Sequence, residues 1–372
     1  MQAAVALPIL LVPARSGAAE VNEAGFTLLG YKERGLMKVT EPILWARGTL
    51  AEGWEVQGSA LLDIVSGASP EGTSNIGGKP VQVISGASIV DHRHQGDLKV
   101  THRSGDVSVA VSGAWSGEED YFSRAFGIEG RLDLNQRNTT LVGGYARSMD
   151  RVGSSTDPTL DAPRNTDEFL VGVTQVLSRT AAVQSTLTRS MGSGWYNDPY
   201  RYTLTFYAPS QGLAPAFYAD TRPPRRDSWA WLTRYRQHLP DLRGTLHVDY
   251  RYFRDDWDIR AHTLEVAWQQ ELGEHWSLQP ALRYHTQSAA RFYSPLVPAV
   301  QPDVLSSDQR LAAFGGLTPS VKAILRFDNG FTIDASVGSI HNARTLKFGG
   351  GGSEAFATLR AVYGLITVSR LF

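Results

Sequence analysis

Charged side chains recur at every second position in several segments of this sequence. Because successive side chains of a β-strand point to opposite faces, this spacing gathers the charges on one face of each strand. The residues are Glu129, Arg131 and Asp133; Arg234, Arg236 and His238; Arg243, His247, Asp249 and Arg251; and Glu265, Arg283 and His285. A wall of mixed charge can line a water-filled pore, or its members can pair across strands and narrow or seal the interior. We therefore expect these residues to line a lumen.

Two short clusters have the residue types of a metal site. His92 and His94 fall on one face of a strand and could share a metal ion, and residues 118–120 offer the carboxylates that Ca²⁺ prefers. The histidines have no third ligand in the sequence, and an acidic run of this kind is more simply a solvated turn. We expect no metal site and no cofactor.

Nucleophilic catalysis finds no support in the residue spacing. The loop that begins at Ser66-Gly-Ala-Ser-Pro70 has neither the Gly-x-Ser-x-Gly spacing of a nucleophile elbow nor a phosphate-loop lysine. A membrane-embedded hydrolase would need a serine beside His262 at the lipid-facing rim, and no predicted neighbouring strand supplies one. We expect no catalytic residue and no enzyme activity; a hydrolase remains a minor alternative.

The segments that carry these residues alternate between apolar and polar positions. Val107, Val109 and Val111 oppose Ser108 and Ala110, and similar alternation leads into residues 331–337 and 361–372. Many of these segments reach the roughly ten residues that a tilted transmembrane strand needs, whereas strands of soluble sandwiches usually have about five or six. The pattern predicts an all-β fold, a transmembrane antiparallel up-and-down β-barrel.

Turn residues set the number of strands. Short turns are predicted near residues 51–53, 104–106, 135–138, 178–179, 240–241, 273–274 and 328–330, and mostly longer connections alternate with them. Seven short turns imply about sixteen strands with both termini on the periplasmic side. The first strand, at residues 26–31, and the segment 200–207, which could be an extra hairpin inside a loop, leave fourteen to eighteen strands possible. The long segment 191–227, with Arg222, Arg225 and Arg226, either folds into the lumen as a constriction that favours anions or lies outside as a solvated loop.

Both ends of the chain fit export to the bacterial outer membrane. Residues 3–12 form an apolar run, and Ser16-Gly-Ala-Ala19 suits cleavage after Ala18 or Ala19, so residues 1–19 are predicted to be a signal peptide. Residues 20–372 then form a single barrel domain. The terminal Phe372 resembles the aromatic residue by which barrels are presented to the barrel-assembly machinery, and we expect it to be the assembly signal.

Composition excludes several other classes. The net charge is −1, and the chain contains nine tryptophans and no cysteine. A near-neutral chain is not expected to bind nucleic acid. The absence of cysteine excludes disulfides, a lipid-modified N-terminal cysteine and covalently attached haem.

The strands and turns also contain the segments Asp63–Pro70, Ser116–Ser123, Asn135–Leu141, Val173–Ser178, Tyr196–Tyr200, Tyr250–Arg254 and Trp257. Together these segments resemble an uncharacterised outer-membrane family, the domain of unknown function 3570. The resemblance implies an outer-membrane barrel and assigns neither a substrate nor a catalytic residue.

Two functions follow from a barrel with charged inward faces. The first is a porin-like channel or transporter for small hydrophilic solutes, embedded in outer-membrane lipid and lipopolysaccharide. The second is a sealed barrel that acts as a scaffold or sheath for a periplasmic or surface protein partner. Strand alternation fits both, because it fixes which side chains face inward but not whether water passes between them.

Overall fold

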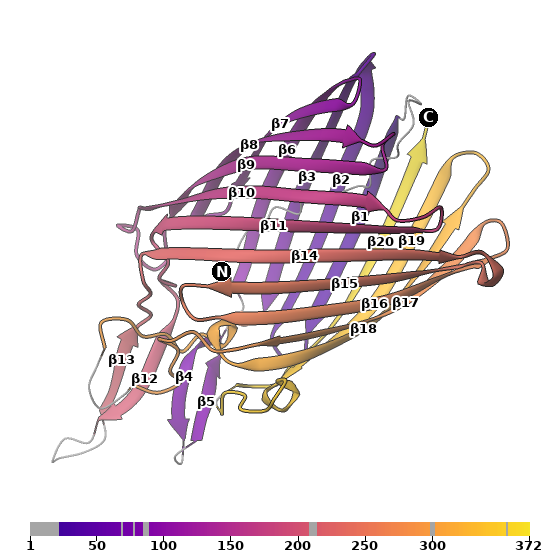
Figure 1. The fold of residues 1–372 in the computed structure, drawn as a ribbon. Helices are drawn as coiled ribbons and strands as arrows, with labels where there is room; N and C mark the ends of the chain where they lie inside the picture. Colours follow the sequence, from indigo (N-terminus) through magenta and orange to yellow (C-terminus); the bar gives the residue numbers. More distant parts are fainter. Residues whose placement is uncertain are drawn as a thin grey trace.

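Sixteen antiparallel strands close into one barrel (Figure 1). The computed structural model describes residues 22–67, 70–76, 79–84, 89–207, 214–297, 302–354 and 356–372. The expected signal peptide, residues 1–19, lies outside the described residues. The barrel strands are β1 (Glu23–Glu33), β2 (Met37–Ala51), β3 (Trp54–Gly67), β6 (Ile89–Ser104), β7 (Val107–Gly117), β8 (Tyr121–Leu134), β9 (Thr139–Val152), β10 (Ala162–Val176), β11 (Ala181–Gly194), β14 (Arg225–Leu239), β15 (Gly244–Asp255), β16 (Arg260–Leu272), β17 (Trp276–Gln287), β18 (Phe314–Arg326), β19 (Phe331–Ala343) and β20 (Leu359–Leu371).

The first and last strands close the sheet. β1 pairs with β20 from Glu23 opposite Leu371 to Glu33 opposite Ala361. The hydroxyl groups of Thr27 and Thr367 lie 2.9 Å apart across this seam. Closure leaves no open edge in the barrel, as a sheet in lipid requires. The predicted antiparallel barrel of sixteen strands is confirmed.

Short turns and long connections lie at opposite ends of the barrel. The seven short turns join strands at the predicted positions, and Gly53, Gly105, Gly273 and Gly330 have positive φ there. Glycine suits such turns because it has no Cβ to oppose a left-handed backbone. We call this the turn end. The opposite end, where residues 195–224 and 288–313 connect strands, is called the loop end.

Four further strands form a small sheet from the loops. β4 (Pro70–Ile76), β5 (Lys79–Ile84), β12 (Tyr202–Tyr207) and β13 (Ala214–Ala219) make two hairpins. The hairpins join where β12 runs parallel to β4, which gives the order β13-β12-β4-β5. This sheet extends away from the barrel wall at the loop end (Figure 1). The segment 200–207 therefore contributes to a loop hairpin and adds no strand to the barrel.

The outer face of the barrel is apolar. Leu44, Leu98, Val111 and Ile366 expose 62%, 54%, 54% and 53% of their surface, although each lies in a strand. Their parity is opposite to that of the charged residues on the same or neighbouring strands, as the alternation predicts. Among the described residues, no helix is long and apolar enough to cross a membrane.

Aromatic side chains lie near both ends of this outer face. Trp54 at the turn end packs against His102 with ring centroids 4.4 Å apart and the rings tilted by 33°, and Trp276 is 52% exposed. Trp115, Trp229 and Trp231 lie on the outer face nearer the loop end. Aromatic rings at these two levels are typical of the girdles that mark the lipid–water interfaces.

The register of β15 can be tested by two substitutions. Val248 lies opposite Tyr235 and Val266 on the outer face, whereas Arg251 lies on the inner face. Val248→Arg should lower the free energy of unfolding from lipid vesicles by about 2–4 kcal/mol, because the charge would face hydrocarbon. Arg251→Ala should leave it nearly unchanged. Denaturant titration of both variants measures the difference, and the reverse ranking would show that the register is displaced by one residue.

The terminal aromatic residue can be tested by deletion. Phe372 is 71% exposed, and its backbone N–H donates to the carbonyl of Asn22 at 2.9 Å, beside the closing seam. If Phe372 is the assembly signal, its deletion should reduce the amount of heat-modifiable, folded barrel in the outer membrane while synthesis stays constant. Deletion of the exposed loop residue Phe348 is the control. Unchanged amounts after loss of Phe372 would remove its assigned role.

Candidate functional site

The charged residues predicted to line the lumen lie on the inner face of the barrel, with one exception. Those on the inner face are Glu129, Arg131 and Asp133 on β8, Arg234, Arg236 and His238 on β14, His247, Asp249 and Arg251 on β15, Glu265 on β16, and Arg283 and His285 on β17. Arg243 is different because it lies in the turn before β15 with φ of 46°. Its Nη2 donates to the carbonyl of Gly273 in the next turn at 2.9 Å. Arg243 therefore belongs to the turn end and not to the strand wall.

The charged residues of β8 are neutralised by ion pairs. Arg131 Nε lies 2.7 Å from Glu129 Oε1, and Lys99 Nζ on β6 lies 3.6 Å from the same oxygen. Nearer the turn end, Arg103 Nη1 donates to Asp133 Oδ2 at 3.0 Å. This part of the wall is charged but balanced, which compensates the cost of placing ions away from bulk water.

A second part of the inner wall is predominantly basic. Arg234 and Arg236 both approach Asp249, with Arg236 Nη2 donating to Oδ2 at 3.1 Å and Arg234 Nε 3.6 Å from the same oxygen. Arg251 and Arg283 belong to no ion pair within the described residues. Four guanidinium groups thus lie near only two carboxylates: Asp249, which pairs with Arg234 and Arg236, and Glu265, which lies opposite Arg283 in the strand register. We call Arg234, Arg236, Arg251 and Arg283 the basic group.

A third part of the wall is predominantly acidic, and the sequence interpretation missed it. Arg93 Nη2 on β6 lies 3.0 Å from Asp63 Oδ2 on β3 and 3.9 Å from Glu41 Oε1 on β2, and its Nε lies 3.9 Å from Glu118 Oε1. Asp91 lies on the same inner face of β6. One guanidinium therefore lies within 3.9 Å of three carboxylates, and Asp91 adds a fourth on the same face. We call Glu41, Asp63, Asp91 and Glu118 the acidic group.

The acidic and basic groups face each other across the lumen. The acidic group lies mainly on the second to fourth strands in the barrel order, and the basic group on the tenth, eleventh and thirteenth. In a ring of sixteen strands, these positions are about half a turn apart. Figure 1 shows β2 and β3 on the back wall and β14 and β15 on the front wall. Charges of opposite sign on facing walls produce an electric field across the interior.

Glu118 corrects the expectation of a solvated acidic turn. Only 8% of its side chain is exposed, and one carboxylate oxygen has no hydrogen-bond partner in the described part of the chain. Burial, with a further contribution from Asp91, raises the pKa of Glu118 to about 7. Asp120 also has a partner, because it accepts a hydrogen bond from the hydroxyl of Tyr200. The charge of the acidic group therefore increases as the pH rises through neutrality.

Loops at the loop end are joined by a buried ion cluster. Asp308 is 1% exposed and accepts hydrogen bonds from Arg222 Nη2 at 3.0 Å and Arg310 Nε at 2.8 Å. Asp198 accepts from Arg310 Nη2 at 3.0 Å, and Arg201 lies within 3.5 Å of both aspartates. Burial alone would raise the pKa of Asp308, but the guanidinium groups of Arg310, Arg201 and Arg222 hold it well below its usual range. The cluster links residues 195–224 to residues 288–313.

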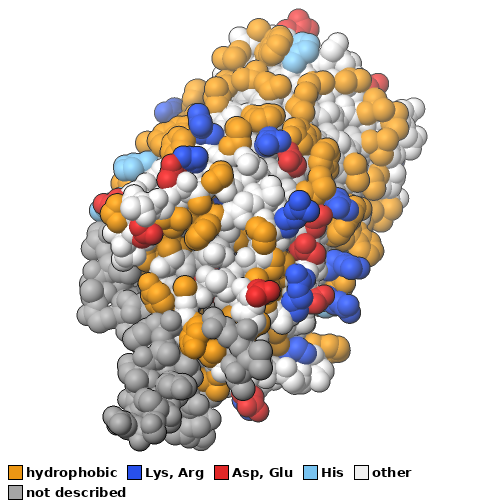
Figure 2. All heavy atoms as spheres, turned by 90° about the vertical axis from the view of Figure 1, so that its left-hand side faces the viewer, with side chains coloured by type: hydrophobic (Ala, Val, Ile, Leu, Met, Phe, Trp, Pro, Cys, Tyr) orange, Lys and Arg blue, Asp and Glu red, His pale blue; other side chains and the backbone are white. Residues whose placement is uncertain are grey.

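The arginines of the segment 191–227 do not form a free cationic constriction. Arg222 belongs to the buried ion cluster, and Arg226 Nη2 lies 2.7 Å from Asp255 Oδ2. Arg226 also lies over the ring of Trp257, 4.4 Å from its centroid. Trp257 is 1% exposed within a small apolar core that includes Phe292. Figure 2 views this end of the molecule and shows basic and acidic side chains interspersed, with hydrophobic side chains beside them.

The histidine sites considered from the sequence have different surroundings. His262 on the outer face lies 2.7 Å from the hydroxyl of Tyr250, and the residues directly opposite it are Tyr252 and Thr286, not serine. His92 and His94 share the outer face of β6. Across the described residues, no group of three or more His, Asp or Glu side chains is arranged to hold a metal ion.

The structure is similar to outer-membrane barrels of known structure. A bacterial polysaccharide outer membrane secretin aligns over 95% of this chain and 98% of its own, with 9% identity and a TM-score of 0.52. CdiB from Acinetobacter baumannii aligns over 94% of this chain and 60% of its own, with 8% identity and a TM-score of 0.53. At such identities the likeness concerns the fold alone. No curated protein matches the sequence.

The sequence itself matches one family. The match extends over residues 1–362, which include every charged wall described above. The chain therefore belongs to the family described as "Protein of unknown function (DUF3570)".

Proposed function

We propose that this barrel lies in the bacterial outer membrane and provides a water-filled path for small hydrophilic solutes. The apolar outer face, bounded by aromatic side chains, supports the location, since such a surface is stable against lipid. The inner face supports the path because many of its charged side chains are part-exposed. Such groups need either water or partner charges to compensate them.

The observation that carries the proposal is the opposition of the acidic and basic groups. A lumen that was only a packed structural core would be expected to pair its charges, because an unpaired buried ion is costly. Arg251 and Arg283 instead have no carboxylate within ion-pair distance among the described residues, while the acidic group has a surplus of carboxylates. Unbalanced charge on facing walls suits hydrated, charged solutes. Cations are attracted to the acidic wall and anions to the basic wall.

A sealed scaffold is the second candidate, and the sheet at the loop end favours it. β13 and β5 are the two outer strands of that sheet and have no further strand beside them in the described residues. An unpaired strand edge can bind an extended segment of another protein by adding a strand. On this alternative the barrel anchors the sheet and carries no solute.

Conductance distinguishes the two candidates. Purified protein inserted into planar bilayers should show a steady open state, because the path is proposed to be filled with water. A barrel that inserts and stays silent, while it copurifies with a protein bound to the loop-end sheet, would support the scaffold. Heat-modifiable migration before insertion serves as the control that the barrel is folded.

The wall charges predict opposite changes in ion preference. Arg251→Gln with Arg283→Gln should lower the anion-to-cation permeability ratio, and Glu41→Gln with Asp91→Asn should raise it. One unit charge at ~8 Å in water changes the energy of an anion and of a cation by about 0.5 kcal/mol each, in opposite directions, so each substitution should change the ratio roughly fivefold at low salt. Asp63 is left intact to keep its partner Arg93 neutralised. Reversal potentials in a salt gradient give the ratio.

The matched control is Arg370→Gln, which removes an arginine from the outer face at the turn end. Arg370 lies over the ring of Phe331, 5.0 Å from its centroid, and far along β20 from the loop end. Its removal should leave the permeability ratio unchanged. Shifts of the same sign in both wall variants would contradict the arrangement of the two groups.

The ion cluster predicts how firmly the loops are held. Asp308→Asn removes the carboxylate shared by Arg222 and Arg310, and breaking a buried ion pair typically costs about 3–5 kcal/mol. Residues 288–313 should then be cleaved by trypsin at least about tenfold faster in the membrane-inserted protein. Asp303→Asn, an exposed position in the same loop, is the control. Equal cleavage rates would show that the cluster does not hold these loops.

A further inference from the structure

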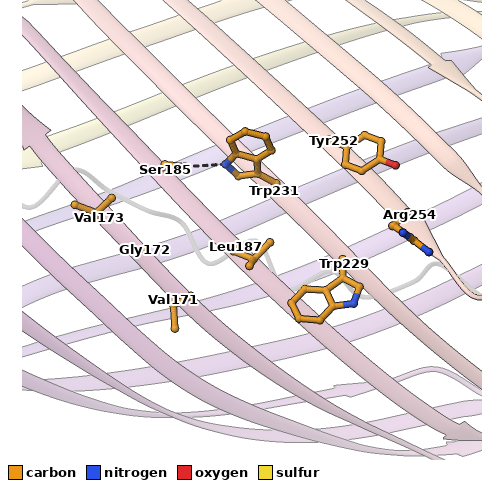
Figure 3. Close-up of a pocket in the computed structure, with 9 residues that line it drawn as sticks. All are labelled: Val171, Gly172, Val173, Ser185, Leu187, Trp229, Trp231, Tyr252 and Arg254. Carbon is orange, nitrogen blue, oxygen red and sulfur yellow. Dashed lines mark hydrogen bonds between the residues drawn. The ribbon is translucent and has the colours of Figure 1, made fainter.

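An open groove runs along the outer face of β10, β11, β14 and β15. It has a volume of about 740 Å³, and its side chains include Val171, Val173, Leu187, Trp229 and Trp231. Figure 3 shows the two valines on one side and the two tryptophans on the other, with Leu187 between them. Ser185 also lines the groove and lies opposite Val173 on β10 and Thr233 on β14.

A hydrogen bond fixes one wall of the groove. Trp231 Nε1 donates to Ser185 Oγ at 2.8 Å, so the indole satisfies its polar group within the protein (Figure 3). The rest of the ring remains 49% exposed and available to apolar contact. The shape and the apolar lining suit a hydrocarbon chain held against the barrel wall.

Two unpaired arginines lie at the loop end of this groove. Arg254 lines the groove, and Arg260 lies directly opposite it on β16. Both side chains are exposed on the outer face, and neither belongs to an ion pair within the described residues. Like charges directly opposite each other on neighbouring strands are destabilising, and a bound anion would relieve their repulsion.

Two neighbouring outer-face arginines, Arg147 and Arg189, have carboxylate partners. Arg147 Nη1 lies 3.3 Å from Asp167 Oδ1, and Arg189 Nη2 lies 3.2 Å from Asp227 Oδ2. Arg189 also lies over Trp229, 4.8 Å from the ring centroid. Positive charge without an ion-pair partner among the described residues therefore remains at Arg254 and Arg260, where the groove ends, and at Arg225, which begins β14 farther toward the loop end.

We propose that this groove binds one phosphorylated glycolipid of the outer leaflet. A phosphate oxygen accepts hydrogen bonds from Arg254 and Arg260, and an acyl chain lies against Leu187 and Trp231. Arg254 is the next-to-last residue of β15 and Arg260 the first of β16, so both lie at headgroup level when the loop end faces outward. The inference rests on the outer-membrane location proposed above and does not depend on an open pore.

Native mass spectrometry of the detergent-purified protein tests the site with bisphosphorylated lipid A as the probe. The natural protein should retain one lipid. The double variant Arg254→Gln with Arg260→Gln should bind lipid A at least about tenfold more weakly. Each hydrogen bond between a guanidinium group and the phosphate contributes to the free energy of binding, and the variant loses both charged donors. Arg370→Gln, the outer-face arginine at the turn end, should leave binding unchanged. Equal affinity of the double variant and the natural protein would overturn the proposal.

Three further measurements identify the ligand. Dephosphorylated lipid A should bind the natural protein at least about tenfold more weakly, whereas equal binding would exclude recognition of phosphate. Phosphatidylglycerol should not compete at equal concentration, since equal competition would assign the groove to a phospholipid. Ser185→Leu, which fills the groove and leaves both arginines in place, should also weaken binding of lipid A, and an unchanged affinity would exclude the groove as the acyl site.

The lipid experiment is independent of the conductance experiment. A silent barrel that binds lipid A through Arg254 and Arg260 would remove the pore and retain the lipid site. A conducting barrel that binds lipid A equally well without Arg254 and Arg260 would retain the pore and remove the lipid site.

Discussion

Closure of the sheet between β1 and β20 is the constraint on which the rest of the structure depends. In a hydrocarbon environment a backbone N–H or C=O without a partner is costly, so a sheet must return to its own first strand. The pairing of β1 with β20, from Glu23 opposite Leu371 to Glu33 opposite Ala361, closes the ring of strands. Once the ring is closed, alternation along each strand sends one set of side chains to the outer face and the other to the interior.

The interior then has to accommodate many charged groups. On β6 and β8 they form local ion pairs, as Glu129, Arg131 and Lys99 do. On β2, β3 and β6 they form a surplus of carboxylates, and on β14, β15 and β17 a surplus of guanidinium groups. Because these strands are about half a barrel apart, the surplus charges cannot neutralise one another by contact. The separation is maintained by the rigid ring and gives the lumen its two unlike walls.

The loop end combines a closed polar cluster with an open outer surface. Asp308, Arg222 and Arg310 form ion pairs with one another and join two long loops, so the positive charges of both arginines are compensated by a carboxylate. On the outside of the same end, Arg254 and Arg260 are exposed beside an apolar groove. Arginines at this end therefore differ in role. Those near a carboxylate join the loops, and those without one remain exposed on the outer face.

The sequence by itself determined the fold class, the approximate number of strands and the face that most charged strand residues occupy. These features are local, because period-two alternation and turn residues such as Asp328-Asn-Gly330 act over a few positions. For the same reason the inner face of residues 129–133 and 247–251 could be predicted. Arg243 was misplaced because its left-handed turn conformation interrupts the alternation by one residue.

Only the tertiary structure decided which charges meet. Glu41, Asp63 and the first carboxylate of the acidic run 118–120 lie in three separate segments. They gather around Arg93 only when β2, β3, β6 and the end of β7 are side by side. Arg222 and Asp308 are 86 positions apart in the chain, so no local pattern could predict their pairing. The physical reason is that strand alternation fixes direction within a strand, whereas the distance between charges depends on the register and closure of the whole ring.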